Sequence, residues 1–171
     1  DSGGAHVTVI TAGANQRPGE SRTDLLLRNW GVFKDVIPKV AEANPEGIIV
    51  IATNPVDVLT FGAWGLTNLP RGKVIGSGTI LDTARFRSHL ANHFRVDARS
   101  VHACIIGEHG DTEVPVWSRA SISSMSLREF GEAQGRGHDQ EALHAIYERT
   151  RSAAKDIIII FSVLFARVMP P

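Results

Sequence analysis

The stretch Ile48-Ile49-Val50-Ile51-Ala52-Thr53-Asn54-Pro55 decides which fold we expect for this chain. Its first five residues are apolar without a polar alternation, which is typical of a parallel strand covered on both faces. Asn54 is suited to cap a following helix and Pro55 to occupy its first position, so we expect a helix to about residue 66. A buried strand leading directly into a helix is the building unit of an α/β fold.

The segments around this stretch repeat the same alternation. Residues 5–11 are rich in β-branched residues and predict a strand, and residues 73–75 predict a short one. Between the first two strands we expect a long helix that Pro38 kinks or divides. Its apolar face is marked by spacings of three and four at Leu26, Trp30, Phe33, Ile37 and Val40. The fold class is therefore α/β, with a parallel sheet up to residue 76.

The second part of the chain, residues 77–171, predicts mixed α+β structure. Thr79 to Asp82 has the form of a capping box at the start of a helix over about 81–94. The apolar run 101–106 predicts a strand, and 113–117 predicts a second one. We expect no defined element over 127–137 and a helix over about 139–160.

The composition excludes several classes of protein. The chain has 171 residues, 43% of them hydrophobic and 21% charged, which is typical of globular domains. Its 18 basic and 18 acidic residues give no electrostatic case for binding nucleic acid or an anionic membrane. The apolar run Ile157–Ala166 has about half the length that a transmembrane helix needs, and we expect no secretory signal. Because Cys104 is a single cysteine, an internal disulfide is excluded, and we expect a cytoplasmic protein.

His109 is the candidate acid/base, because Ile106-Gly107-Glu108-His109-Gly110-Asp111-Thr112 places it on a glycine-flanked turn after a strand. Asp82 and Arg85, three residues apart, share one face of a helix. An arginine fork can bind a carboxylate, and a histidine held by Asp82 could pass a proton to a carbonyl oxygen. The alternatives are a surface histidine and an exposed ion pair worth less than about 1 kcal/mol. Arg22 at a helix start and Asn54 at a strand end are further candidates. We expect no metal site.

Four runs of sequence resemble the lactate/malate dehydrogenase family, in order and at the family's spacing. They extend the resemblance over about residues 5–155, and they are Val9-Ile10-Thr11-Ala12-Gly13-Ala14-Asn15-Gln16-Arg17-Pro18-Gly19-Glu20-Ser21-Arg22, Thr53-Asn54-Pro55-Val56-Asp57, Val74-Ile75-Gly76-Ser77-Gly78-Thr79-Ile80-Leu81-Asp82-Thr83-Ala84-Arg85-Phe86-Arg87 and Gly107-Glu108-His109-Gly110-Asp111. The resemblance implies the second half of a Rossmann-type NAD-binding domain over residues 1–76. It implies a truncated substrate domain over residues 77–171.

The resemblance also implies the role of each site residue. His109 would give a proton to the keto oxygen of pyruvate, and Asp82 would hold its imidazole. Arg85 would bind the substrate carboxylate, Arg22 would polarise the carbonyl group, and Asn54 would bind substrate beside the nicotinamide. Hydride would come from NADH. Cofactor-lining positions match Gly13, Ala14, Ala52, Asn54 and Ser77.

Gln16 indicates the substrate within this family. Lactate enzymes carry glutamine at the matching position and malate enzymes carry arginine. An arginine would pair with the second carboxylate of oxaloacetate, whereas an uncharged amide tolerates the methyl group of pyruvate. The resemblance thus implies L-lactate formation in fermentation and glycolysis. Malate dehydrogenase is the alternative, because Arg17 lies next to Gln16.

Arg87 and His102 match positions that bind fructose bisphosphate between subunits in bacterial members of the family. Other members keep similar residues without this activation, so a solvated arginine and a histidine at a strand start are the alternative. The resemblance implies a homo-oligomer, as family members are tetramers.

The chain departs from the family at both ends. The strand, the G-x-G-x-x-G turn and the acidic residue that open the family's dinucleotide fold do not occur here. The Lys-Gly and Thr-Tyr segment of the family does not follow Ile158. We therefore expect a fragment of the enzyme, and an inactive remnant that forms oligomers is an alternative of another class. A Ser-His-Asp hydrolase is a poor alternative, because no serine lies on a G-x-S-x-G elbow.

Overall fold

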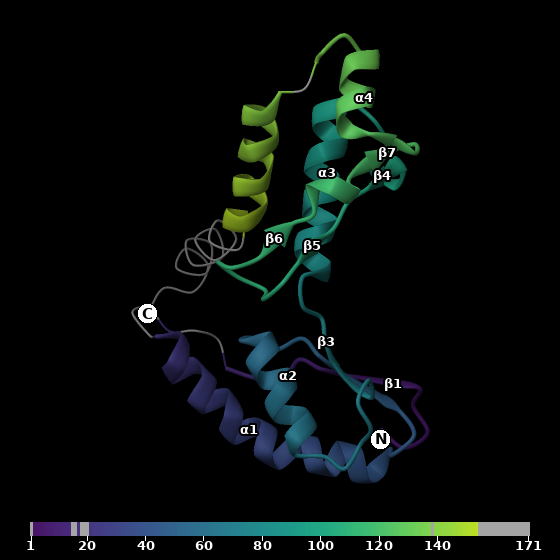
Figure 1. Ribbon diagram of the computed structural model, residues 1–171. Coiled ribbons are helices and arrows are strands. Elements are labelled where there is room, and N and C mark those ends of the chain that lie inside the picture. Colours follow the sequence, from purple (N-terminus) through teal and green to yellow (C-terminus); the bar gives the residue numbers. More distant parts are fainter. Residues whose placement is uncertain (1, 15–16, 18–20, 138, 154–171) are drawn as a thin grey trace, which may run out of the picture. The chain divides into compact units, whose positions relative to one another are not determined.

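The computed structural model describes residues 2–14, 17, 21–137 and 139–153 of the chain (Figure 1). The chain divides into two compact units, Asp1–Gly78 and Thr79–Pro171. We call these the N-terminal unit and the C-terminal unit, and we describe each by itself. No helix in the described ranges combines the length and apolar character needed to cross a membrane.

A three-stranded parallel sheet forms the centre of the N-terminal unit. Its strands are β1 (Val7–Ile10), β2 (Ile48–Ile51) and β3 (Val74–Gly76), in the order β1-β2-β3. Helix α1 (Arg22–Ala43) connects the first two strands and α2 (Val56–Gly65) connects the last two. The alternation of strand and helix predicted from the sequence, and with it the α/β class, is confirmed.

One face of this sheet carries the core of the unit. Ile49 and Ile51 of β2 are buried in a cluster with Phe33 and Ile37 of α1 and Leu59 of α2. The opposite face is open: Val9 is 56% exposed and Ile75 is 43% exposed. The expectation that residues 48–52 are covered on both faces is therefore wrong for the described residues. The reason is that the buried side chains of α1 and α2 join the single cluster around Ile49 and Ile51.

The helix ends of this unit follow local hydrogen bonds. Ser21 caps α1 by accepting from the Asp24 N–H at 3.1 Å, and the helix runs on through Pro38 without division. The expectation that Asn54 caps α2 is wrong, because α2 begins at Val56 with Pro55 as its cap residue. The missing side chain of Gly62 lets the ring of Trp30 approach α2, since a Cβ there would lie 2.5 Å from Trp30 Cζ3.

The C-terminal unit is built on α3 (Ile80–Phe94) and two small antiparallel sheets. The strands β4 (Val101–His102), β7 (Ser121–Ile122) and β8 (Met125–Ser126) form one sheet, with the order β4-β7-β8. The strands β5 (Ile105–Ile106) and β6 (Val114–Pro115) form the other. Short 3-10 helices cover Ala98–Ser100 and Trp117–Arg119, and longer helices cover Leu127–Ala133 (α4) and residues 140–153.

Two expectations for this unit are corrected. The single strand expected over 101–106 is two strands, because β4 pairs with β7 whereas β5 pairs with β6. Residues 127–137 were expected to lack a defined element, yet α4 begins there. The signal for α4 is in the sequence, since Ser126 and Glu129 cap each other's main-chain groups in a capping box.

Apolar side chains from α3 fill the core of the C-terminal unit. Phe86 and Leu90 are fully buried against Val101 and Ile122 of the antiparallel sheet. The ring of Trp117 meets Phe86 edge to face, with ring centroids 5.0 Å apart. This packing fixes the N-terminal turn of α3, which carries Asp82, the expected partner of His109.

Candidate active site

Asp82 lies in the first turn of α3, and its side chain is 5% exposed. A carboxylate in the first turn interacts favourably with the positive end of the helix dipole. Arg85, one turn later, places Nη1 3.8 Å from Asp82 Oδ1 with a side chain that is 21% exposed. The shared helix face predicted for the two residues thus brings them close together.

The strand that leads to His109 is attached to the start of α3. Thr79 donates its hydroxyl to the main-chain oxygen of Ile105 at 2.6 Å, and Thr83 Oγ1 accepts from the Ile105 N–H at 3.0 Å. The capping box expected at Thr79 is therefore wrong: its hydroxyl makes no cap bond because it bonds β5. These two bonds fix the distance between α3 and the end of β5.

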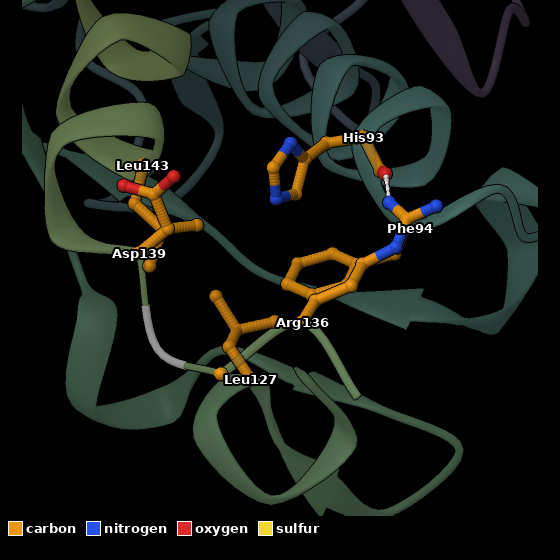
Figure 2. Close-up of a pocket in the computed structure, with 7 residues that line it drawn as sticks. His93, Phe94, Leu127, Arg136, Asp139 and Leu143 are labelled. Carbon is orange, nitrogen blue, oxygen red and sulfur yellow. Dashed lines mark hydrogen bonds between the residues drawn. The ribbon is translucent and has the colours of Figure 1, made fainter. Parts of the chain in front are cut away.

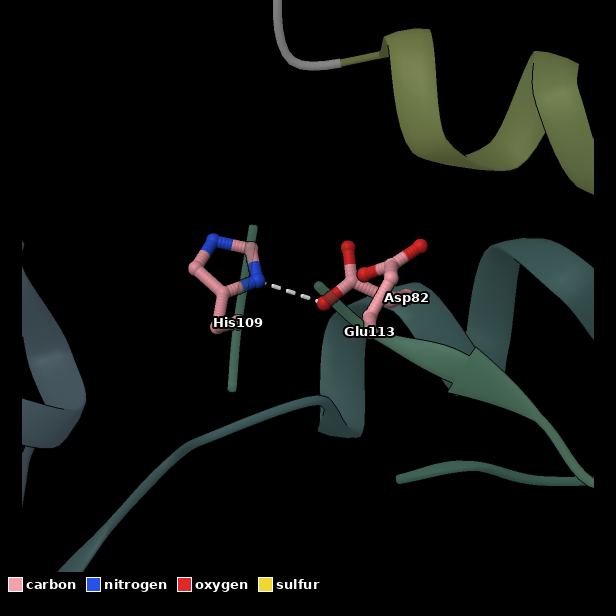
Figure 3. Close-up of side chains that lie close together, drawn as sticks. All are labelled: Asp82, His109 and Glu113. Carbon is pink, nitrogen blue, oxygen red and sulfur yellow. Dashed lines mark hydrogen bonds and ion pairs between the residues drawn. The ribbon is translucent and has the colours of Figure 1, made fainter. Parts of the chain in front are cut away.

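His109 lies in the turn that joins β5 to β6. Two glycines shape this turn in the left-handed region that favours glycine, Gly107 with φ 97° and Gly110 with φ 148°. The imidazole Nδ1 lies 2.5 Å from Asp82 Oδ2, and the side chain is 22% exposed (Figure 3). A hydrogen bond from Nδ1–H to the carboxylate makes Nε2 the acid/base atom.

Glu113 joins this pair, although it was not among the residues predicted from the sequence. It is 5% exposed, and its Oε1 has no hydrogen-bond partner among the described residues. Burial, and next the charge of Asp82, raise the pKa of Glu113 above its ordinary value of 4.5. Its place four residues after the histidine, just before a short apolar strand, is visible in the sequence but carries no information about its burial.

The ligand atoms of Asp82, His109 and Glu113 all lie within 4.8 Å of one another. An imidazole nitrogen and two carboxylates at this spacing have the chemistry to hold a cation. However, the 2.5 Å contact between Asp82 and His109 describes a hydrogen-bonded pair in which one carboxylate oxygen is already used. The group is therefore best described as an acid/base pair with a second carboxyl group beside it.

In the N-terminal unit, the candidate cofactor residues follow the three parallel strands at their carboxyl ends. Gly13 and Ala14 come after β1, Ala52 and Asn54 after β2, and Ser77 after β3. Main-chain bonds align these ends, with the Ala52 N–H on Ile10 O at 2.9 Å and the Ser77 N–H on Ile51 O at 2.8 Å. This edge is where open α/β sheets bind ligands.

A buried asparagine, also missed from the sequence, holds two of these strand ends together. Asn29 of α1 is fully buried, accepts from the Ala14 N–H at 2.7 Å and donates to Asn54 O at 2.8 Å. A Cβ at Gly13 would lie 3.1 Å from Asn29 Oδ1 and 2.5 Å from the Thr53 methyl group. Glycine is needed there because the chain packs tightly against both side chains.

The other expected site residues are placed only in part. Gln16 and the side chain of Arg22 lie outside what the structure describes, apart from Arg22 being the first residue of α1. Arg87 of α3 donates from Nη2 to Ala98 O at 3.3 Å, and His102 of β4 is exposed. The structure thus gives Arg87 a protein partner of its own.

Each of the two units also has a hollow. In the C-terminal unit, His93 and Phe94 face Asp139 and Leu143 across a cavity of about 240 Å³ (Figure 2). In the N-terminal unit, Trp64 and neighbouring residues line one of about 330 Å³. Neither hollow is lined by Asp82 or His109, so neither is the cavity of the candidate acid/base pair.

Comparison with known proteins identifies the family. The model of the lactate/malate dehydrogenase NAD-binding domain matches residues 1–76, and that of the family's α/β C-terminal domain matches residues 79–160. The chain belongs to the lactate/malate dehydrogenase family. Among curated members, it is 52% identical to L-lactate dehydrogenase of Thermus aquaticus and 45% identical to that of Moorella thermoacetica, each over 158 residues.

These dehydrogenases are about twice as long as the chain. The matches cover 92% of this chain, but 51% of the Thermus aquaticus protein and 50% of the Moorella thermoacetica protein. The solved structure of a minor L-lactate dehydrogenase from Enterococcus mundtii superposes with a TM-score of 0.84 at 39% identity, again over 92% of this chain and 50% of that one. The chain spans about half the length of the dehydrogenases it matches.

Proposed function

We propose that the chain carries the proton-transfer and substrate-binding residues of an NAD-dependent L-lactate dehydrogenase, which reduces pyruvate reversibly. The observation that carries this proposal is the Asp82–His109 hydrogen bond beside Arg85. Bound NADH would supply the hydride that goes to the carbonyl carbon. His109 would give its Nε2 proton to the carbonyl oxygen, and Asp82 would stabilise the imidazolium before the transfer.

Arg85, together with Arg22 and Asn54 from the N-terminal unit, would bind and orient the substrate. A guanidinium matches a carboxylate through two parallel hydrogen bonds, and Arg85 already lies beside the acid/base pair. We propose that residues 1–76 form an NAD-binding part and residues 77–171 a substrate-binding part. We propose Gln16 as the residue that selects pyruvate over oxaloacetate.

The residues present fit one part of a dinucleotide. Gly13 and Ala52 are small and exposed at the carboxyl edge of the parallel sheet, beside Ala14 and Ser77. A flat ring needs such a surface of small side chains. We propose that these residues line the nicotinamide half of the cofactor site.

The test is a chimera in which the matched residues of this chain replace the corresponding segment of the Thermus aquaticus protein. We expect NADH oxidation with pyruvate as substrate, and a loss of about a hundredfold or more in kcat for His109→Asn. His144→Asn is the matched control, because the side chain of His144 is 73% exposed and faces Glu148 at 4.0 Å. Full turnover by His109→Asn would remove it as the acid.

Substrate choice has its own test in the same chimera. Gln16→Arg should raise kcat/KM for oxaloacetate relative to pyruvate by at least tenfold, because a guanidinium can pair with the second carboxylate. Asn68→Arg, at an exposed position, controls for added charge. An unchanged ratio of the two kcat/KM values would count against Gln16 and reopen the malate alternative.

The resemblance to the family also supports a proposal on assembly and regulation. We propose a homo-oligomer working in the cytoplasm, with Arg87 and His102 as an anion site for fructose bisphosphate. Arg87→Glu in the chimera should abolish any activation by the bisphosphate, since it reverses the charge. Activation that persists in Arg87→Glu would contradict this site.

A further inference from the structure

Glu113 is brought to the catalytic pair by the β5–β6 hairpin. It immediately precedes β6, and the pairing of Ile106 with Val114 returns the chain to the end of β5. From the helix over 140–153, Tyr147 donates its hydroxyl to the main-chain oxygen of Glu113 at 2.6 Å. The backbone of Glu113 is thus held from two sides, and Figure 3 shows its carboxyl group next to that of Asp82.

Oε1 of the Glu113 carboxyl group makes no hydrogen bond that would hold the described part of the fold. Oε1 is buried without a hydrogen-bond partner among the described groups. An ionised carboxylate in this position is costly unless a proton or a positive charge compensates it. His109 can gain and lose a positive charge, and its ligand atom lies within 4.8 Å of that of Glu113.

The charges that face Glu113 come from three elements. Asp82 and Arg85 face it from α3, His109 faces it from its own turn, and Arg151 faces it from the helix over 140–153 beside Tyr147. Burial and Asp82 raise its pKa, while His109, Arg151 and Arg85 lower it. Electrostatic coupling between two titrating groups is reciprocal, so Glu113 must act on His109 as strongly as His109 acts on Glu113.

We propose that Glu113 is a positioning residue whose carboxyl group sets how tightly His109 holds its proton. As Glu113 ionises, its negative charge keeps the imidazolium charged to higher pH. The pH range over which His109 can act as an acid is thereby extended upward. The consequence for catalysis rests on the proposed function of His109, whereas the coupling itself does not.

The experiment is an NMR titration of the histidine ring signals in the 171-residue chain. The chain has seven histidines, and the signal lost in His109→Asn identifies His109. In Glu113→Gln we expect the midpoint of the His109 titration to fall by roughly one pH unit, the effect of removing a charge at this distance. Glu108→Gln is the control, because Glu108 adjoins His109 but is exposed. The titration midpoint of His109 in Glu108→Gln should stay near that in the parent chain.

A reciprocal measurement keeps the test decisive if Glu113→Gln does not fold. Carbon-13 titration of the Glu113 carboxyl group should give a higher midpoint in His109→Asn than in the parent chain, because the positive neighbour is gone. Equal His109 midpoints in Glu113→Gln and Glu108→Gln would overturn the proposal, and so would an unmoved Glu113 midpoint. Neither readout needs turnover, so an inactive chimera with shifted midpoints would refute the proposed function and leave the coupling standing.

In an active chimera, the coupling also has a kinetic readout. Pyruvate reduction by Glu113→Gln should lose activity at a lower pH than the parent, by the same interval that NMR measures. Lactate oxidation, which needs the neutral imidazole, should begin at a correspondingly lower pH. A uniform loss of kcat without a shift of either profile would point to a merely structural role.

Discussion

At the scale of single residues, the buried polar groups around His109 differ in whether their hydrogen bonds are made. Asp82 and His109 bond each other, whereas Oε1 of Glu113 has no hydrogen-bond partner in the part of the chain that the structure describes. Both residues of the pair were predictable, because the sequence shows a histidine on a glycine-flanked turn and an Asp three residues before an Arg. Glu113 was not, because its importance depends on a hairpin register and on burial.

Glu113 makes a prediction for stability as well as for proton transfer. Since its pKa is higher in the folded chain than its ordinary value of 4.5, the folded chain binds more protons than the unfolded chain above that pH. The free energy of unfolding should therefore fall as the pH rises from about that value through the raised one. Urea unfolding at a series of pH values should show a smaller fall for Glu113→Gln. Parallel curves for Glu113→Gln and the parent would contradict this.

At the scale of elements, side chains that bond main-chain groups place the loops. Thr79 and Thr83 tie β5 to α3, and Asn29 ties the ends of β1 and β2 together. The strands and helices of the N-terminal unit followed from hydrophobic periodicity, as α1 and β2 illustrate. Periodicity carries no information about strand partners, which is why the run 101–106 was expected to be one strand. A threonine next to a helix start also predicts a cap from the sequence, even where its hydroxyl bonds another group, as that of Thr79 does.

Asn29 tests this view of the loops. Asn29→Leu keeps the branched shape of the side chain but leaves the Ala14 N–H and the Asn54 carbonyl without their partner, at a cost of about 1–3 kcal/mol for each group that stays buried. We expect a loss of at least about 1 kcal/mol in urea unfolding. Asn92→Leu, at an exposed position in α3, should change stability much less. Equal effects of the two substitutions would argue against a stabilising role for the two hydrogen bonds of Asn29.

The capping box of α4 allows a second test at this scale. Ser126→Ala removes the acceptor for the Glu129 N–H and the partner of its carboxylate, and should cost about 1 kcal/mol. Ser88→Ala, at an exposed position in α3, is the matched control. A thermal or urea unfolding series that ranks the two substitutions equally would speak against the cap.

At the scale of the whole molecule, charge balance and exposed apolar surface act together. The chain has no net charge at neutral pH, and Val7 and Val9 of β1 are 50% and 56% exposed. Molecules without net charge repel each other least, so solubility should be lowest near neutral pH and rise on either side. Val9→Lys should raise the solubility at that minimum more than Asn68→Lys does, because Asn68→Lys adds the same charge at an exposed position that is already polar. Light scattering across the pH range would measure both effects.

The positions of the three indole rings allow the fluorescence of the two units to be measured separately. Trp30 and Trp64 belong to the N-terminal unit, and Trp117, edge-on to Phe86, belongs to the C-terminal unit. Replacing Trp30 and Trp64 by phenylalanine leaves Trp117 as the single indole, which reports on the unit containing His109. Replacing Trp117 alone removes the indole emission of that unit and leaves that of the other. Emission from the two variants during one denaturant series would thus show whether the two units of this chain unfold together or in succession.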